Sequence, residues 1–242
     1  MLSLGVISTS VVLTVPPASP PPVAVHCLAL RPVPYRIARE ILVREHYLHA
    51  FPGGTALALG IFVGDRLLGV VTLGNGPRSF SQTVRGASQR DFLVLTRLWL
   101  HADCPRNSET HILGQAVRLL RHGTGLKFLV SYADPSAAGP DGVPHVGYVY
   151  QAASWMYIGF SHAMPLLDLG DGIPRHLRSV NSALGTHSVR HLQASGLIPR
   201  LVPQAAKHAY LFFIDRRWRK RLLVPVLPYP KPAWEVSNGG NS

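Results

Sequence analysis

Two short runs of this sequence hold residue types that can carry out chemistry. The first, SYADP, closes an apolar stretch with Tyr132, which can donate or accept a proton, and Asp134, which can orient a substrate amine or bind a metal. The second, REHYLHAFPGG, holds His46, Tyr47 and His49, whose nitrogen and oxygen atoms could bind iron together with a distant Asp or Tyr. The spacing matches no standard metal motif. A turn aspartate before a proline and a neutral histidine at a helix end are the structural alternatives.

A third run, DCPRNSET (103–110), has the composition of a phosphate-binding turn at the start of a helix. The first turn of a helix leaves backbone N–H groups unpaired and carries partial positive charge. Arg106, Asn107, Ser108 and Thr110 add side-chain donors at this point. Since the run has no glycine-rich loop, an ordinary helix cap beside a solvated arginine explains it equally well.

The segment 145–159 (HVGYVYQAASWMYIG) is dense in tyrosine. Tyr148 and Gln151 are three residues apart, so they share a face of the expected helix. Aromatic side chains at such spacing are usually core residues, and we expect two of the three tyrosines, Tyr148, Tyr150 and Tyr157, to be buried.

The charge balance is strongly basic, and it favours a nucleic-acid partner. The formal net charge is +12, and because only four of the 24 basic residues are lysines, arginine dominates the excess. The arginine fork matches phosphate oxygens, although a GC-rich genome also enriches arginine. The densest cluster surrounds Trp218, an aromatic that could stack on a base. Its candidate DNA-binding residues are Arg216, Arg217, Arg219, Lys220 and Arg221; a solvated basic tail is the alternative.

The elements that must position these residues predict a mixed α/β fold with a single central sheet flanked by helices. The hairpin at Gly64-Asp65 joins two runs too uniformly apolar to face water, so both faces of the sheet should be covered. Ser108 is the expected N-cap of its helix, and 78–91 is expected to be an exposed polar loop. Strands are expected at 23–30, 56–63, 66–74, 92–100, 126–134, 155–163 and 208–214. Helices are expected at 34–47, 109–123, 145–154, 174–185 and 186–196.

Other features restrict the class of protein. Two cysteines, Cys27 and Cys104, cannot form a disulfide framework or a zinc site, which favours a cytoplasmic protein. The apolar N-terminus has no preceding basic region, so a secretory signal is not expected, and no apolar run is long enough to span a membrane. We predict a loose proline-rich leader (1–22), one catalytic domain (23–225) and a proline-rich tail (226–242).

Taken together, LTRLWL…PRNSET, SYADP and H-x-G-x-x-Y-Q-A-x-x-W-x-Y-x-G resemble the Mom DNA-modification proteins of Mu-like phages, a divergent branch of the GNAT acetyltransferase superfamily. EHYLHAFPGG also fits this pattern, and residues 25–165 carry most of the resemblance. The resemblance implies conversion of adenine in double-stranded DNA to its N6-carbamoylmethyl form, which shields phage DNA from restriction in the host cytoplasm. It also implies an acetyl-CoA-type cofactor and iron. A redox-capable metal makes chemical sense because the product is not a simple acetyl amide.

The resemblance further implies roles for particular residues. His46 and Tyr47 match the family's His-Tyr pair, Asp134 matches its SYADP aspartate, and Tyr47 and Tyr150 are the suspected iron ligands. Arg97 and Ser108 match a strand arginine and a helix-start serine near the cofactor, where Arg106 and Asn107 also lie. The loop 136–144 and the leader depart from the family pattern, and a homodimer stays open. The rival functions are an ordinary N-acetyltransferase and a non-catalytic DNA-binding protein.

Overall fold

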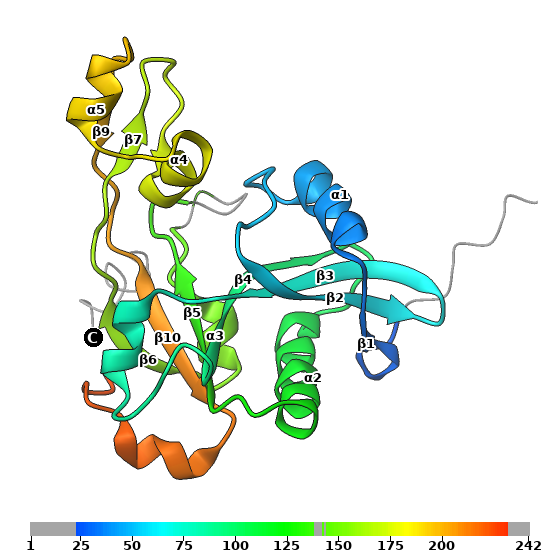
Figure 1. Cartoon of the computed structure of the whole chain (residues 1–242). Helices are drawn as coiled ribbons and strands as arrows, with labels where there is room; N and C mark the ends of the chain where they lie inside the picture. Colours follow the sequence, from blue (N-terminus) through cyan, green and yellow to red (C-terminus); the bar gives the residue numbers. More distant parts are fainter. Residues whose placement is uncertain (1–22, 138–141, 143, 232–242) are drawn as a thin grey trace, which may run out of the picture.

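The computed structural model describes residues 23–137, 142 and 144–231 (Figure 1). Its main sheet has seven strands in the order β1-β2-β3-β4-β5-β10-β6, and only β4 and β5 pair in parallel among them. The mixed α/β fold predicted from the sequence is confirmed. The strands of this sheet are β1 (Ala29–Pro32), β2 (Thr55–Val63), β3 (Arg66–Gly74), β4 (Phe92–Leu100), β5 (Phe128–Ala133), β6 (Met156–Phe160) and β10 (His208–Phe213). The helices that accompany it are η1 (Val25–Cys27), α1 (Tyr35–Glu45), η2 (Arg78–Thr83), α2 (Ser108–Gly123), α3 (Tyr148–Ala152) and η3 (Arg216–Arg221).

Helices cover both faces of the β2–β3 hairpin, as its apolar runs predict. Ala58 and Val70 pack with α1, whereas their chain neighbours Leu59 and Val71 belong to the large core that includes α2. Side chains alternate between the faces of a strand, so these neighbours point in opposite directions. Figure 1 shows α1 and α2 on opposite sides of the sheet.

The parallel pair β4 and β5 separates partway along its length. The pairing runs from Phe92 opposite Phe128 to Leu95 opposite Ser131. Beyond this point β4 continues to Leu100 with β3 as its only described partner, with Arg97 opposite Thr72. The ends of the two parallel strands therefore diverge, which leaves room between them at the carboxyl end of the sheet.

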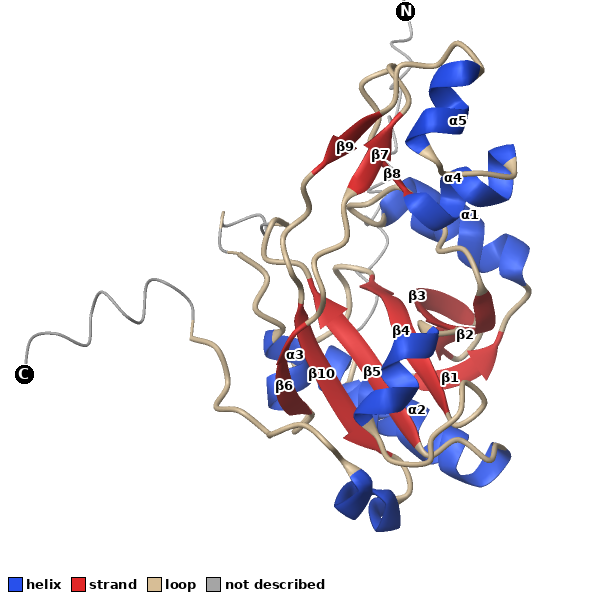
Figure 2. Cartoon of the chain, turned by 60° about the vertical axis from the view of Figure 1, so that its left-hand side comes forward, coloured by secondary structure: helices blue, strands red, loops and turns tan. Residues whose placement is uncertain are grey.

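A second, three-stranded sheet, which the sequence did not predict, lies between β6 and β10 in the chain. With its two helices it forms a module, residues 166–202, whose own core centres on Leu167, Val180 and Leu192. Both views place the module beyond one end of the main sheet (Figures 1 and 2). Its elements are β7 (Leu166–Asp168), β8 (Arg175–His176), α4 (Leu177–Leu184), α5 (Val189–Ala194) and β9 (Arg200–Val202). The two helices expected here are confirmed.

Two local expectations are wrong. The run 78–91 is not simply an exposed polar loop, because Phe80 in η2 and Val84 directly after it are buried against Phe92 and Phe128. The first strand also begins later than expected, because the 3-10 turn η1 occupies the residues before it. In both segments, a few apolar side chains pack against the hydrophobic core.

The predicted leader 1–22 and the end of the tail, 232–242, lie outside the described residues, as does most of the loop 136–144. The first part of the tail lies along β6. The Leu227 amide donates to the Tyr157 carbonyl and the Tyr229 hydroxyl donates to the Trp155 carbonyl, at 2.9 Å each. The division of the chain into leader, domain and tail stays a prediction.

Candidate active site

The predicted catalytic side chains gather where β4 and β5 diverge. Arg97 extends from β4 beyond the last β4–β5 pair, and Asp134 directly follows β5. Tyr47 interacts electrostatically with both of these groups, and Tyr150 interacts with Tyr47 and Arg97. Four elements that are far apart in sequence thus bring one cation, one carboxylate and two phenols into one site.

Tyr47 contacts two imidazole rings and is partly exposed. Its ring stacks on His46 with centroids 4.4 Å apart, and the His145 ring centroid lies 5.8 Å away. Tyr47 is 56% exposed, whereas His46 is only 5% exposed. Burial raises the pKa of the Tyr47 hydroxyl, so it is a neutral phenol at physiological pH. His145 was missed as a site residue, and only its position in the H-x-G motif marks it.

His46 is a fixed, neutral part of the site. Its Nδ1 accepts a hydrogen bond from the Leu48 amide at 3.1 Å. Burial, with smaller contributions from the charges of Arg97 and His49, lowers its pKa to about 4. His46 is therefore uncharged at neutral pH.

This lowered pKa predicts a stability difference between wild type and His46→Asn, which keeps an acceptor for the Leu48 amide. The unfolded histidine titrates near 6.5 and the folded one near 4, so the unfolded chain takes up the proton first. Folded-state stability should therefore fall as pH drops through that window, and the variant should fall less. Melting temperatures from about pH 7 to about pH 4 measure this difference. Parallel curves for the two proteins would contradict it.

Arg97 is positively charged and has an N–H donor that forms no hydrogen bond within the described residues. One terminal nitrogen donates to the Thr96 carbonyl at 2.6 Å, but its Nε is buried and has no hydrogen-bond partner within the described chain. Burial lowers the pKa of the guanidinium, which still stays protonated because arginine titrates far above neutrality. A buried donor without a partner is costly, so a substrate or cofactor oxygen is its natural acceptor.

Asp134 is held by two donors. Lys207 Nζ lies 2.9 Å from one carboxylate oxygen, and the Ser136 amide donates to the other at 3.0 Å. Burial alone would raise the pKa of Asp134, but Lys207 and Ser136 together lower it below its ordinary value. Lys207 was missed because it is far away in sequence; only the register of β10, with His208 opposite Ala133, places it here.

The tyrosine-rich segment divides as predicted, with Tyr150 and Tyr157 buried and Tyr148 exposed. Burial raises the pKa of Tyr150 to about 12, and a hydrogen bond with the Ser131 side chain offsets part of this effect. Tyr150 is thus a protonated phenol between the core and the site. Gln151 is not exposed beside Tyr148; its amide donates to the hydroxyl of buried Tyr210 at 3.1 Å.

The expected cofactor residues begin α2, but their cap differs from the prediction. Ser108 is wrong as the N-cap, since Asn107 caps the helix in a left-handed conformation with φ 66°. That turn buries Ser108, whose hydroxyl donates to the Pro105 carbonyl at 2.6 Å. No side chain caps the N–H groups of this 16-residue helix, and Arg106 beside them is exposed. The backbone, rather than Ser108, offers donors to a phosphate.

The basic run 216–221 is a structural element, not a free tail. It forms η3, whose Trp218 packs beneath the sheet under the Arg221 guanidinium, 4.4 Å from the ring centroid. Arg217 is paired with Asp215. Figure 1 shows η3 (orange) beyond the opposite end of β10 from the module. The structure does not bring this basic run to the catalytic cluster.

The suspected iron ligands, Tyr47 and Tyr150, are protonated phenols. In the part of the chain that the structure describes, no group of three His, Cys, Asp or Glu residues could hold an ion. Tyr47 and Tyr150 would have to ionise to become phenolate ligands, yet burial raises the pKa of both. These donors do not fit a conventional iron centre.

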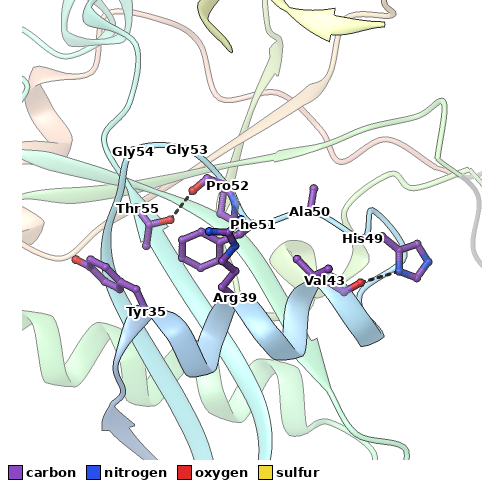
Figure 3. A pocket seen from close by; sticks show the side chains of 10 residues that line it. All are labelled: Tyr35, Arg39, Val43, His49, Ala50, Phe51, Pro52, Gly53, Gly54 and Thr55. Carbon is purple, nitrogen blue, oxygen red and sulfur yellow. Dashed lines mark hydrogen bonds between the residues drawn. The ribbon is translucent and has the colours of Figure 1, made fainter. Parts of the chain in front are cut away.

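A hollow in the described surface lies beside this cluster, not in it. It measures about 560 Å³ between α1 and the loop that follows it, and Figure 3 shows Arg39 and His49 on its wall. None of the four predicted catalytic side chains lines it. No helix within the described ranges is long and apolar enough to cross a membrane.

Comparison with known folds gives solved structures of low sequence identity. An N-acetyltransferase from Staphylococcus aureus Mu50 is 8% identical, with a TM-score of 0.42 over 77% of this chain and 97% of that one. FeeM, an N-acyl amino acid synthase from uncultured soil microbes, is 12% identical, with a TM-score of 0.41 over 81% and 95%.

Sequence comparison is more specific. The methylcarbamoylase mom of Escherichia phage Mu is 33% identical over 202 residues, which cover 81% of this chain and 80% of that protein. The model of the Mom protein family matches residues 27–231, nearly all of the described structure. The chain belongs to the Mom protein family.

Proposed function

We propose that this protein is a DNA-modifying enzyme that converts adenine in double-stranded DNA to N6-carbamoylmethyladenine. The observation that carries the proposal is the convergence of Tyr47, Arg97, Asp134 and Tyr150 in a chain of the Mom family. The relative from phage Mu is named a methylcarbamoylase. This name agrees with a product in which one methylene carbon joins a carbamoyl group to N6 of adenine. The modification would protect phage DNA from restriction in the host cytoplasm.

Each side chain has a chemical task in this proposal. Asp134 is ionised, so its carboxylate accepts a hydrogen bond from the adenine amino group and orients it. Arg97 and the phenols of Tyr47 and Tyr150 donate to oxygen atoms on which negative charge develops. The Asp134 carboxylate therefore acts on the adenine, and the three donors act on the other reactant.

The substrate base must leave the duplex to reach these groups. Flipping a base out of the helix costs a few kcal/mol, which is recovered in part when the base stacks on an aromatic ring. The exposed Tyr47 ring, with His145 beside it, offers such a surface. We propose that the adenine stacks there.

Acetyl-CoA or a related acyl-CoA is the proposed cofactor, with its phosphates at the uncapped start of α2. We expect Arg106→Glu to weaken acetyl-CoA binding by about tenfold, since it replaces an exposed cation beside the helix start with an anion. The same substitution at Arg118, later in the same helix, should leave affinity unchanged. Isothermal titration calorimetry measures both variants. Equal acetyl-CoA affinities of the two variants would show that the cofactor phosphates do not bind at this turn.

The family resemblance also implies iron, with Tyr47 and Tyr150 as ligands. Burial raises the pKa of both phenols and keeps them protonated, so they do not fit an iron centre and iron is not part of the proposed function. Tyr47 and Tyr150 act in the proposal as hydrogen-bond donors.

The modified nucleoside tests the function directly. Host DNA from cells that express the protein with ample iron is digested to nucleosides, and the adenosines are weighed by mass spectrometry. A carbamoylmethyl increment supports the proposal. An acetylated protein or amine with unchanged adenosine would support an ordinary N-acetyltransferase instead. Duplex binding without any transfer would support a non-catalytic DNA-binding protein.

A further inference from the structure

The module 166–202 leaves the main sheet directly beside the site. Its return segment ends at Lys207, and the next residue, His208, pairs with Ala133, which precedes Asp134. The two connecting segments are bonded to each other, since the Ser161 amide donates to the Lys207 carbonyl at 2.8 Å and the Lys207 amide donates to the Ser161 hydroxyl at 3.0 Å. The strand register therefore fixes the base of the module at the catalytic end of the sheet.

The part of the module nearest the site is positively charged. His176 interacts with Lys207, Arg97, Arg178 and Asp134, so these groups share one region. Asp134 is the only carboxylate among them, and it is already paired with Lys207. Arg178 on α4 is exposed and forms no ion pair within the described residues.

Neither acidic residue of the module forms an ion pair with Arg178 in the described structure. Asp171 pairs with Arg175, and Asp168 accepts hydrogen bonds from the amides of Gly170 and Gly172. Arg190 and Arg200 are also exposed, and neither forms an ion pair in the described part of the chain. The module thus presents arginines whose charge is free for an external anion.

The length of β10 separates this surface from η3, the other basic element. The six residues of β10 span about 20 Å between them, which is roughly six base pairs along a duplex. Flipping a nucleotide requires a hold on the phosphates next to it. Arg178 shares one region with Arg97 and Asp134, whereas η3 lies beyond the opposite end of β10.

We propose that the module 166–202 holds duplex DNA over the active site, with Arg178 contacting a phosphate next to the flipped adenine. The inference rests on the proposed DNA modification and adds the surface that grips the substrate. It assigns a supporting role to η3, whose arginines carry the same charge but lie at the far end of β10.

Duplex binding over a series of salt concentrations tests this assignment. A labelled adenine-containing duplex is titrated with wild type, Arg178→Glu and the control Arg118→Glu, which makes the same charge change on α2. We expect Arg178→Glu to bind at least about tenfold more weakly and to reduce the slope of log affinity against log salt by about one. The control should match wild type. If Arg178→Glu fails to fold, Arg178→Gln removes the same contact without adding a carboxylate near Asp134, and the same loss of slope is expected.

The outcomes separate the two proposals. Wild-type affinity and salt slope in a folded Arg178 variant, with a loss in an Arg216/Arg219/Lys220→Glu variant, would overturn the module as the DNA-binding surface and assign it to η3. Modification of adenosine by the wild-type protein would still stand in that case. If the wild type neither binds nor modifies the duplex, the proposed function itself fails.

Discussion

Asp134→Ala should lose DNA modification by roughly 100- to 10,000-fold, the range found for groups that assist proton transfer. The wild-type carboxylate is ionised and fixed by Lys207 and the Ser136 amide, so it is ready to accept a hydrogen bond from the adenine amino group. Alanine removes the acceptor and leaves the Lys207 ammonium unpaired at the same place. The yield of modified adenosine measures the loss.

A matched control separates this effect from a general loss of charge. Asp103→Ala also removes a carboxylate paired with a cation, Arg66, but on the exposed turn before α2. Asp103→Ala should keep full activity and a melting temperature within a few degrees of wild type, since surface ion pairs contribute about 0–1 kcal/mol. Normal modification by Asp134→Ala would remove this residue from the chemistry.

Tyr47→Phe should lower modification by at least roughly 100-fold, because it removes only the phenolic hydroxyl that acts beside Arg97 and Asp134. The ring that stacks on His46 stays in place, so affinity for duplex DNA should stay within about twofold of wild type. Measuring product yield and DNA affinity on the same samples distinguishes a chemical role from a binding role.

Tyr35→Phe is the corresponding control, since Tyr35 begins α1, the helix that precedes Tyr47, and its hydroxyl donates to the Ala56 carbonyl at 2.8 Å. It should retain activity. If Tyr47→Phe modifies DNA as well as Tyr35→Phe does, the hydroxyl has no part in the reaction, and Tyr47 is reduced to a surface for stacking.

The sequence predicted the elements that depend on local pattern. The apolar runs of the β2–β3 hairpin, the amphipathic α2 and the order of the first six strands all follow from periodicity and turn residues. The three-stranded sheet of the module was not predicted, because strands of two or three residues such as β8 carry too little periodicity to be recognised.

The site could be predicted only in part, for a similar reason. Tyr47, Asp134 and Tyr150 were named through motifs, and the fold brings them together with Arg97. Lys207 carries no local signal, since its role depends on β10 entering the sheet between β5 and β6. The N-cap at Asn107 was missed because the sequence does not show that this asparagine adopts a left-handed backbone conformation. Ser108, the next residue, is also a common N-cap type.

The position of β10 also has a consequence for biosynthesis. This strand is the last of the sheet to leave the ribosome, yet it lies between two strands made earlier, β5 and β6. Until residues 208–213 emerge, no strand joins β6 to β5, and Lys207 has no strand to hold it beside Asp134. Such non-local pairing forms slowly, because its loop-closure entropy must be overcome first. A nascent chain therefore cannot assemble this site until β10 has emerged.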